Sequence, residues 1–188
     1  SKWVVKTEFE KCTAYNIDTQ EQKEFDDASL IDDDYTLDKP PSSYHTWSEN
    51  GWELTAENEQ KQLSDTRSQY VSSIDSEAAR IYNIWTRFES EYVVREAAAN
   101  EYKNANYEGD ASSFITSVAT SMNISLIDAT ELILQQSQLL RASQEQLAAQ
   151  RMRKYELNAQ TTLDAMRTTY DDIIANMQTI EQTQRAQS

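Results

Sequence analysis

Residues 57–107 read ENEQKQLSDTRSQYVSSIDSEAARIYNIWTRFESEYVVREAAANEYKNANY, a run of about fifty residues without Gly or Pro. Apolar side chains recur along it at mixed spacings of three and four, as on one face of an α-helix. The stripe consists of Leu63, Tyr70, Ile74, Ala78, Ile81, Trp85, Phe88, Tyr92, Ala99 and Tyr102. The pattern predicts one helix over about 56–106, with Thr55 as its candidate N-cap. A helix roughly 75 Å long needs a partner along most of its apolar stripe.

The second half of the chain is predicted to supply that partner, as a short helix over 112–122 and a long helix over 125–181. Asn123 can end the short helix, and Ser125 with Asp128 resembles a capping arrangement. Residues 158–162 are the weakest helical interval, so the long helix is expected to bend or break there. Two long helices joined by a compact corner predict an antiparallel helical hairpin, a coiled-coil-like rod. Its Gln-rich face favours a homo-oligomer.

The N-terminal part predicts a small antiparallel β unit. Alternating apolar and polar side chains indicate strands at 3–9, 12–17 and 22–25. A Pro-Pro pair at 40–41 then breaks the chain. The fold class is therefore mainly α with a small β unit, with domains predicted at 1–54 and 55–188.

A second β feature lies just before the long helix. Asn50-Gly51 is a strong tight-turn signal, and Trp47 and Trp52 flank it. A β-hairpin with two aromatic anchors is therefore expected. The two Trp side chains either pack onto the start of the helix, which we favour, or form a docking surface, because Trp is enriched at binding hot spots.

Charge and hydropathy argue against two classes of partner, nucleic acids and membranes. The net charge of the 188 residues is −15, and residues 1–55 hold thirteen acids against five bases. An acidic surface repels phosphate backbones, so a nucleic-acid partner is not expected. No apolar run approaches the ~18 residues of a membrane span, so no membrane partner is expected either. Cys12 is the only cysteine, which excludes an intrachain disulfide and fits a reducing cytoplasm.

No stretch of the sequence carries a catalytic motif, so the protein is expected not to be an enzyme and to hold no cofactor or metal. His45 is the only histidine. A catalytic pair of Cys12 and His45 would lack a recognisable third group, and a Ser–His–Asp arrangement would lack the Gly-x-Ser-x-Gly nucleophile elbow. Residues 26–34 carry five carboxylates that could hold calcium. Their spacing does not match the helix–loop–helix calcium loop, so a solvated loop or short helix is favoured.

The candidate partner-binding residues are therefore aromatic. The aromatic side chains around Trp85 lie at helical spacing and more often form core, and Tyr82 is the member most expected to be exposed. The hypothesis for partner binding covers Tyr44, Trp47, Trp52, Tyr82 and Trp85.

The order of these elements resembles a known family. An N-terminal β unit, a Pro-rich break, the segment YHTWSENGWE at 44–53 and a charged Ala/Gln/Glu helical run resemble the tail-fibre assembly proteins of tailed bacteriophages. The segment RMRKYEL at 151–157 is similar to a helical stretch near that family's C-terminus, and 81–92 with 109–133 look like small phage tail proteins. The family's Asp-Thr-Ser and Trp-Pro ending is absent, and the helical region here is longer.

The resemblance implies a non-enzymatic fibre-associated chaperone or structural protein that binds a tail fibre or baseplate and assists its assembly or attachment. It implies a location in the host cytoplasm during assembly and leaves room for a place in the virion tail. The alternative from the same sequence is a self-assembling structural or adaptor coiled coil unrelated to phage tails.

Overall fold

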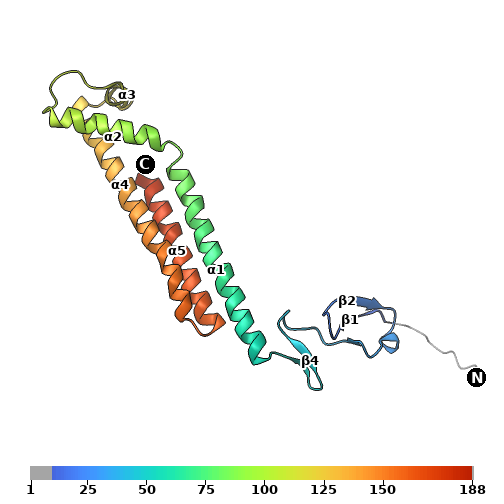
Figure 1. Ribbon diagram of the computed structural model, residues 1–188. Coiled ribbons are helices and arrows are strands. Elements are labelled where there is room, and N and C mark those ends of the chain that lie inside the picture. The colour runs from blue at the N-terminus through green and yellow to red at the C-terminus, as the bar shows by residue number, and fades with distance from the viewer. Residues whose placement is uncertain (1–9, 188) are drawn as a thin grey trace, which may run out of the picture. The chain divides into compact units, whose positions relative to one another are not determined.

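The computed structural model describes residues 10–187, so the strand expected at 3–9 lies outside the described residues. The protein is mainly helical, with a small antiparallel strand unit at its N-terminal side (Figure 1). The chain forms two compact units, 1–66 and 67–188. The predicted domains, 1–54 and 55–188, follow the change from strand to helix and stay a prediction, whereas the compact units divide within helix α1.

The first unit contains a three-stranded antiparallel sheet. It comprises β1 (Cys12–Asn16), β2 (Gln22–Phe25) and β3 (Tyr35–Thr36) in the order β2-β1-β3. The strands expected at 12–17 and 22–25 are confirmed. They are joined by a turn in which the Asn16 side-chain oxygen accepts hydrogen bonds from the N–H groups of Asp18 and Thr19. Ala14 is fully buried at the centre of the sheet.

The expected hairpin is also confirmed, as β4 (Thr46–Ser48) and β5 (Gly51–Glu53). Ser48 pairs with Gly51, so Glu49 and Asn50 form the two-residue turn. Gly51 follows with φ +104°, a conformation that a residue with a side chain rarely adopts.

The helical part contains α1 (Ala56–Trp85), α2 (Glu89–Asn104), α3 (Ser113–Met122), α4 (Leu126–Met152) and α5 (Leu163–Gln187), with a 3₁₀ helix η2 (Arg153–Ala159) between α4 and α5. The short helix expected at 112–122 is present. As a correction, the single helix expected over 56–106 is interrupted at 86–88. The helix expected over 125–181 is interrupted at 153–162, a range that includes the bend or break expected at 158–162.

The interruption after Trp85 has a local contribution and a tertiary one. The Thr86 hydroxyl donates to the Tyr82 carbonyl, four residues back, at 2.9 Å, a bond that often bends helices. The buried residues of α2, Ala99 and Tyr102, join a core with α3 and α4. Residues 86–88 contain no Gly or Pro, so the apolar stripe in the sequence continues across the interruption.

The interruption at 153–162 falls on the interval identified as weak, and it reverses the chain. Ser143 contacts Gln184, and Arg153 contacts Asp172, so α4 and α5 run antiparallel. Tyr70 stacks on Tyr170 with ring centroids 4.2 Å apart. The second part of α1, residues 67–85, therefore packs beside both α4 and α5, where a hairpin of two long helices was expected (Figure 1).

The expected helix ends are confirmed by their caps. The Thr55 hydroxyl accepts a hydrogen bond from the Asn58 N–H at 3.2 Å, and the Ser125 hydroxyl accepts one from the Asp128 N–H at 3.0 Å. Asn123 ends α3 in the left-handed conformation. These signals involve residues within three or four positions of one another, which is why the sequence shows them.

Two groups of buried side chains fill the second unit. One joins α2, α3 and α4 through Ala99, Tyr102, Ile115, Ala119, Ala129, Ile133 and Leu134. The other buried positions lie along α1, α4, η2 and α5 and include Ile74, Ala78, Ile81, Leu147, Leu157, Met166, Ile173 and Met177. The α1–α2 joint lies where one group gives way to the other along the chain.

Candidate functional site

The β4–β5 hairpin carries two of the five candidate partner-binding residues. Trp47 and Trp52 are cross-strand partners, and their rings meet edge to face with centroids 5.2 Å apart. The Trp52 indole N–H donates to the Asp38 carbonyl at 2.7 Å, which fixes that ring against the preceding segment. Both side chains are half-buried. The hairpin therefore presents a braced aromatic pair with part of its surface open to solvent.

Tyr44 lies two residues before the hairpin and is also half-buried. Its hydroxyl donates to Asp65 Oδ2 on α1 at 3.0 Å, and its backbone N–H contacts Ser42 Oγ. The hydrogen bond to the Asp65 carboxylate raises the pKa of the Tyr44 phenol, because ionisation would place two negative charges side by side. Tyr44 thus ties the segment before the hairpin to the first turns of α1.

His45 is held by local contacts. Ser42 Oγ lies 2.9 Å from His45 Nδ1, and the Gln20 side chain donates to the His45 carbonyl at 2.6 Å. A contact between residues three positions apart is typical of a turn. The acidic segment at 26–34 contains a short 3₁₀ helix, η1 (Ala28–Leu30), capped by Asp27. Within residues 10–187, no three His, Cys, Asp or Glu side chains gather as a metal site would require.

Tyr82 and Trp85 lie near the end of α1, in the second unit. Tyr82 is half-buried, and its hydroxyl donates to the Gln144 carbonyl on α4 at 3.0 Å. Trp85 is only 6% exposed and packs edge to face on Tyr82. The hairpin residues belong to the first unit, whereas Tyr82 and Trp85 belong to the second.

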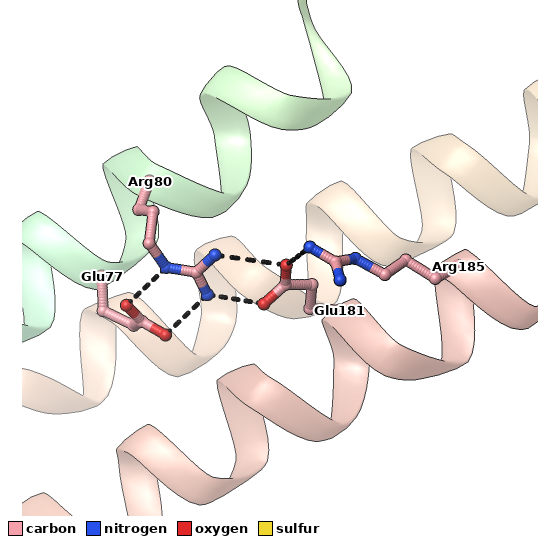
Figure 2. Close-up of polar contacts among 4 residues, drawn as sticks. All are labelled: Glu77, Arg80, Glu181 and Arg185. Carbon is pink, nitrogen blue, oxygen red and sulfur yellow. Dashed lines mark hydrogen bonds and ion pairs between the residues drawn. The ribbon is translucent and has the colours of Figure 1, made fainter.

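Sequence reasoning missed a row of ion pairs between α1 and α5. Arg80 donates to Glu77 on its own helix and to Glu181 on α5, with Arg80 Nη2 2.5 Å from Glu181 Oε2. Figure 2 shows the Arg80 guanidinium between the two carboxylates, with Arg185 on the other side of Glu181. The hydrogen bond from Arg80 keeps the pKa of the Glu181 carboxyl below its ordinary value, although Glu181 is only 7% exposed.

A second ion-pair group joins α1 to the region where α4 ends. Lys154 Nζ lies 2.7 Å from both oxygens of Asp75, and Arg151 Nε lies 2.7 Å from Asp75 Oδ1. The hydrogen bonds from Lys154 and then Arg151 lower the pKa of Asp75. Lys154 is buried, so Asp75 is the charge that compensates it.

A weak signal for these buried charges exists in the sequence. Glu181 follows Ile173 and Met177 at spacings of four, so it continues the apolar stripe of α5. Lys154 lies seven residues after the fully buried Leu147 and takes the same helical face. Charged residues on an otherwise apolar stripe indicate buried partners, but the sequence does not say which.

A relative of this chain is encoded by a bacteriophage. A protein of Haemophilus phage HP1, described as an uncharacterized 23.3 kDa protein in the lys 3′ region, is 40% identical to this chain over 150 residues. The matched part covers 79% of this chain and 75% of the phage protein. No protein-family model matches. No solved structure matches. The similarity indicates a bacteriophage origin. Every helix within residues 10–187 is too short or too polar to cross a membrane.

Proposed function

The chain belongs to the protein family that includes this Haemophilus phage HP1 protein, and on that basis we propose that it is a phage tail-associated protein. In this proposal it binds a tail fibre or baseplate protein and assists its assembly or attachment, without enzymatic activity. It acts in the host cytoplasm during assembly and takes a place in the virion tail. The 40% identity to a phage protein over most of both chains supports the phage origin, and the resemblance of the segment at 44–53 to tail-fibre assembly proteins supports the tail role.

The aromatic hairpin supports a binding role for the first unit. Trp47 and Trp52 are braced against each other and, through Trp52, against the Asp38 carbonyl. A braced aromatic pair loses little conformational freedom on binding, which favours affinity. We propose that the half-exposed surface of this pair, together with Tyr44, contacts the fibre or baseplate protein.

The first experiment is affinity capture of the tagged protein from a lysate in which the phage is assembling, followed by mass spectrometry. The wild-type protein is expected to recover a fibre or baseplate protein in a fixed ratio, and purified particles are expected to contain the protein. Recovery of the protein alone, or of cellular filament proteins, would overturn the tail assignment and favour a self-assembling structural protein.

The hairpin variant Trp47→Ala/Trp52→Ala locates the contact. Recovery of the partner is expected to fall at least about tenfold, as for loss of an aromatic hot spot. Helical circular dichroism is expected to stay close to wild type, because the helices of 67–188 form their own compact unit. Tyr155→Ala on η2 is the matched control, since this aromatic side chain is exposed and lies outside the first unit. Equal loss in both variants would exclude the hairpin as the docking surface.

A further inference from the structure

A cavity of about 500 Å³ lies at the joint between α1 and α2. The end of α1, the first turns of α2, the middle of α4 and the last turns of α5 all contribute to its wall. Ile84, Trp85, Tyr92 and Leu140 supply apolar surface, and Arg95 and Arg185 supply charged groups. All of these residues belong to the second unit. The cavity is separate from the Trp47–Trp52 hairpin, so binding here would be a second property of the protein.

Two side chains in the cavity wall have buried N–H groups without an acceptor. These groups are Trp85 Nε1 and Arg95 Nε, and neither has a hydrogen-bond partner among the described residues. Trp85 is 6% exposed. Buried donors in native proteins are nearly always paired, so two unpaired donors in one wall need an explanation. A ligand that brings hydrogen-bond acceptors would supply one.

The charge of the wall selects the kind of acceptor. The chain holds 32 acids against 17 bases, yet the wall contains two guanidinium groups and no carboxylate. Arg95 contacts Glu91 and Arg185 contacts Glu181, and both of these acids lie outside the wall. Each guanidinium carries five N–H donors, so one carboxylate partner does not use them all. A carboxylate is therefore the acceptor that complements this wall best.

The exposed surface around the joint is apolar, so a ligand for the cavity is expected to carry an apolar group. Phe88, Val93 and Val94 are exposed at the joint and on the first turns of α2, and Val93 is 60% exposed. Ile84, in the cavity wall itself, is also exposed. A large apolar side chain entering the cavity would cover part of this surface and gain from its removal from water.

We propose that this cavity binds a peptide segment of a partner protein in which a large apolar side chain lies next to a carboxylate. The apolar side chain packs against Trp85, Tyr92 and Leu140, and the carboxylate accepts hydrogen bonds from Trp85 Nε1 and the Arg95 guanidinium. The proposal goes beyond the hairpin and does not depend on which tail protein is the partner.

The test uses the full chain and a blocked tetrapeptide, Ala-Phe-Asp-Ala, titrated into ¹⁵N-labelled protein. Two control peptides replace Asp by Asn or Phe by Ala. The indole N–H signal of Trp85 is identified from its absence in Trp85→Phe or, if that variant does not fold, by elimination with Trp3→Phe, Trp47→Phe and Trp52→Phe. Saturable binding is expected to move this signal downfield. The Asp peptide is expected to bind about tenfold more tightly than the Asn peptide, the difference for a hydrogen bond to a charged group.

Two arginine variants separate a site contact from a general charge effect. Arg95→Gln is expected to abolish the preference for Asp over Asn. Arg141→Gln removes an equal charge from α4, where Arg141 pairs with Glu96 on α2 outside the cavity wall, and is expected to keep the preference. Absence of saturable binding, or binding without an Asp preference or with equal effects of both variants, would overturn the proposal. Neither result bears on capture of a tail protein by the hairpin.

Discussion

Buried polar groups are paired in the middle of the second unit, around Asp75 and Arg80, but are left unpaired at the α1–α2 joint. In the middle, each buried charge has a partner on another helical segment, as Lys154 has Asp75 and Glu181 has Arg80. At the joint, Trp85 and Arg95 keep buried N–H groups without an acceptor, and apolar side chains face solvent. A fully paired network fixes the packing of helices, whereas unpaired donors cost free energy unless a ligand satisfies them. The difference fits a stabilising role for the middle and the binding role that we propose for the joint.

Acid is the strongest way to break the paired region, because it acts on both groups at once. The carboxyls of Asp75 and Glu181 have pKa values below the 3.8 and 4.5 of unperturbed groups, because Lys154 and Arg80 donate hydrogen bonds to them. A lowered folded-state pKa gives stability that is fully present above the unfolded value and is lost as pH falls through the folded value. We expect the free energy of unfolding to fall steeply below a pH of about 4.5.

Urea unfolding followed by far-ultraviolet circular dichroism at several pH values measures this. The variant Asp75→Asn/Glu181→Gln is the control and is expected to start less stable but to lose less on acidification. A slope equal to that of the wild type would mean that other carboxylates dominate the acid response.

Removing Asp75 alone tests one half of the network. Asp75→Ala leaves the buried Lys154 ammonium without its carboxylate, and we expect a loss of about 2–3 kcal/mol. The value is below that for a fully buried pair, because the Asp75 side chain is 35% exposed. Asp171→Ala on α5 is the matched control, since Asp171 and Arg167 are both mostly exposed. Its effect on urea unfolding is expected to stay within about 0.5 kcal/mol. Similar losses in both variants would contradict a structural role for the Asp75 group.

At the joint, removal of a charge is expected to change stability little and peptide binding strongly. Arg95→Met keeps an unbranched side chain but removes the unpaired Nε and the contact with Glu91. We expect the free energy of unfolding to stay within about 1 kcal/mol of wild type, because loss of a surface ion pair and relief of an unpaired donor offset each other. The same variant is expected to lose its preference for the Asp tetrapeptide. Destabilisation as large as that of Asp75→Ala would place Arg95 in the stabilising network.

The smallest effect is expected at the interruption between α1 and α2. Thr86→Val removes the hydroxyl that donates to the Tyr82 carbonyl and keeps the shape of the side chain. We expect a change below about 0.5 kcal/mol, with the interruption retained, because α2 packs with α3 and α4. Urea unfolding measures the change in stability, and amide hydrogen exchange at residues 86–89 shows whether the interruption is retained. Strong protection of these amides in the variant would show that Thr86 alone interrupts the helix.

Elements marked by residues close together in sequence were predicted correctly, whereas the interruption that depends on distant contacts was not. The capping side chains of Thr55 and Ser125, and the left-handed Asn123, act within a few residues, and all three mark helix ends in the structure. The Trp47–Trp52 hairpin follows from a turn signal of the same short range. The helix over 56–106 failed as one element, because its apolar stripe continues through Thr86 although the two halves pack against different segments.

The candidate sites show the same division. Trp47, Trp52 and Tyr44 are near one another in sequence, and the structure places all three at the hairpin or just before it. Their role in binding stays a prediction. Trp85 and Tyr82 were singled out as aromatic residues on a helix, whereas the cavity beside Trp85 requires α2, α4 and α5 to meet α1. No spacing in the sequence predicts that meeting, because Trp85 and Gln184 are far apart along the chain.

The sequence by itself determined the mainly helical class, the small β unit, the hairpin and the helix ends, because these depend on periodicity and on hydrogen bonds between near neighbours. Tertiary structure decided which helices pack together, that the helix expected over 56–106 is interrupted after Trp85, and which buried charges find partners. Those outcomes depend on contacts between residues such as Arg80 and Glu181, which become neighbours only after the chain reverses at 153–162. Contacts of the same kind also leave the Trp85 and Arg95 side chains with unpaired N–H donors at the joint.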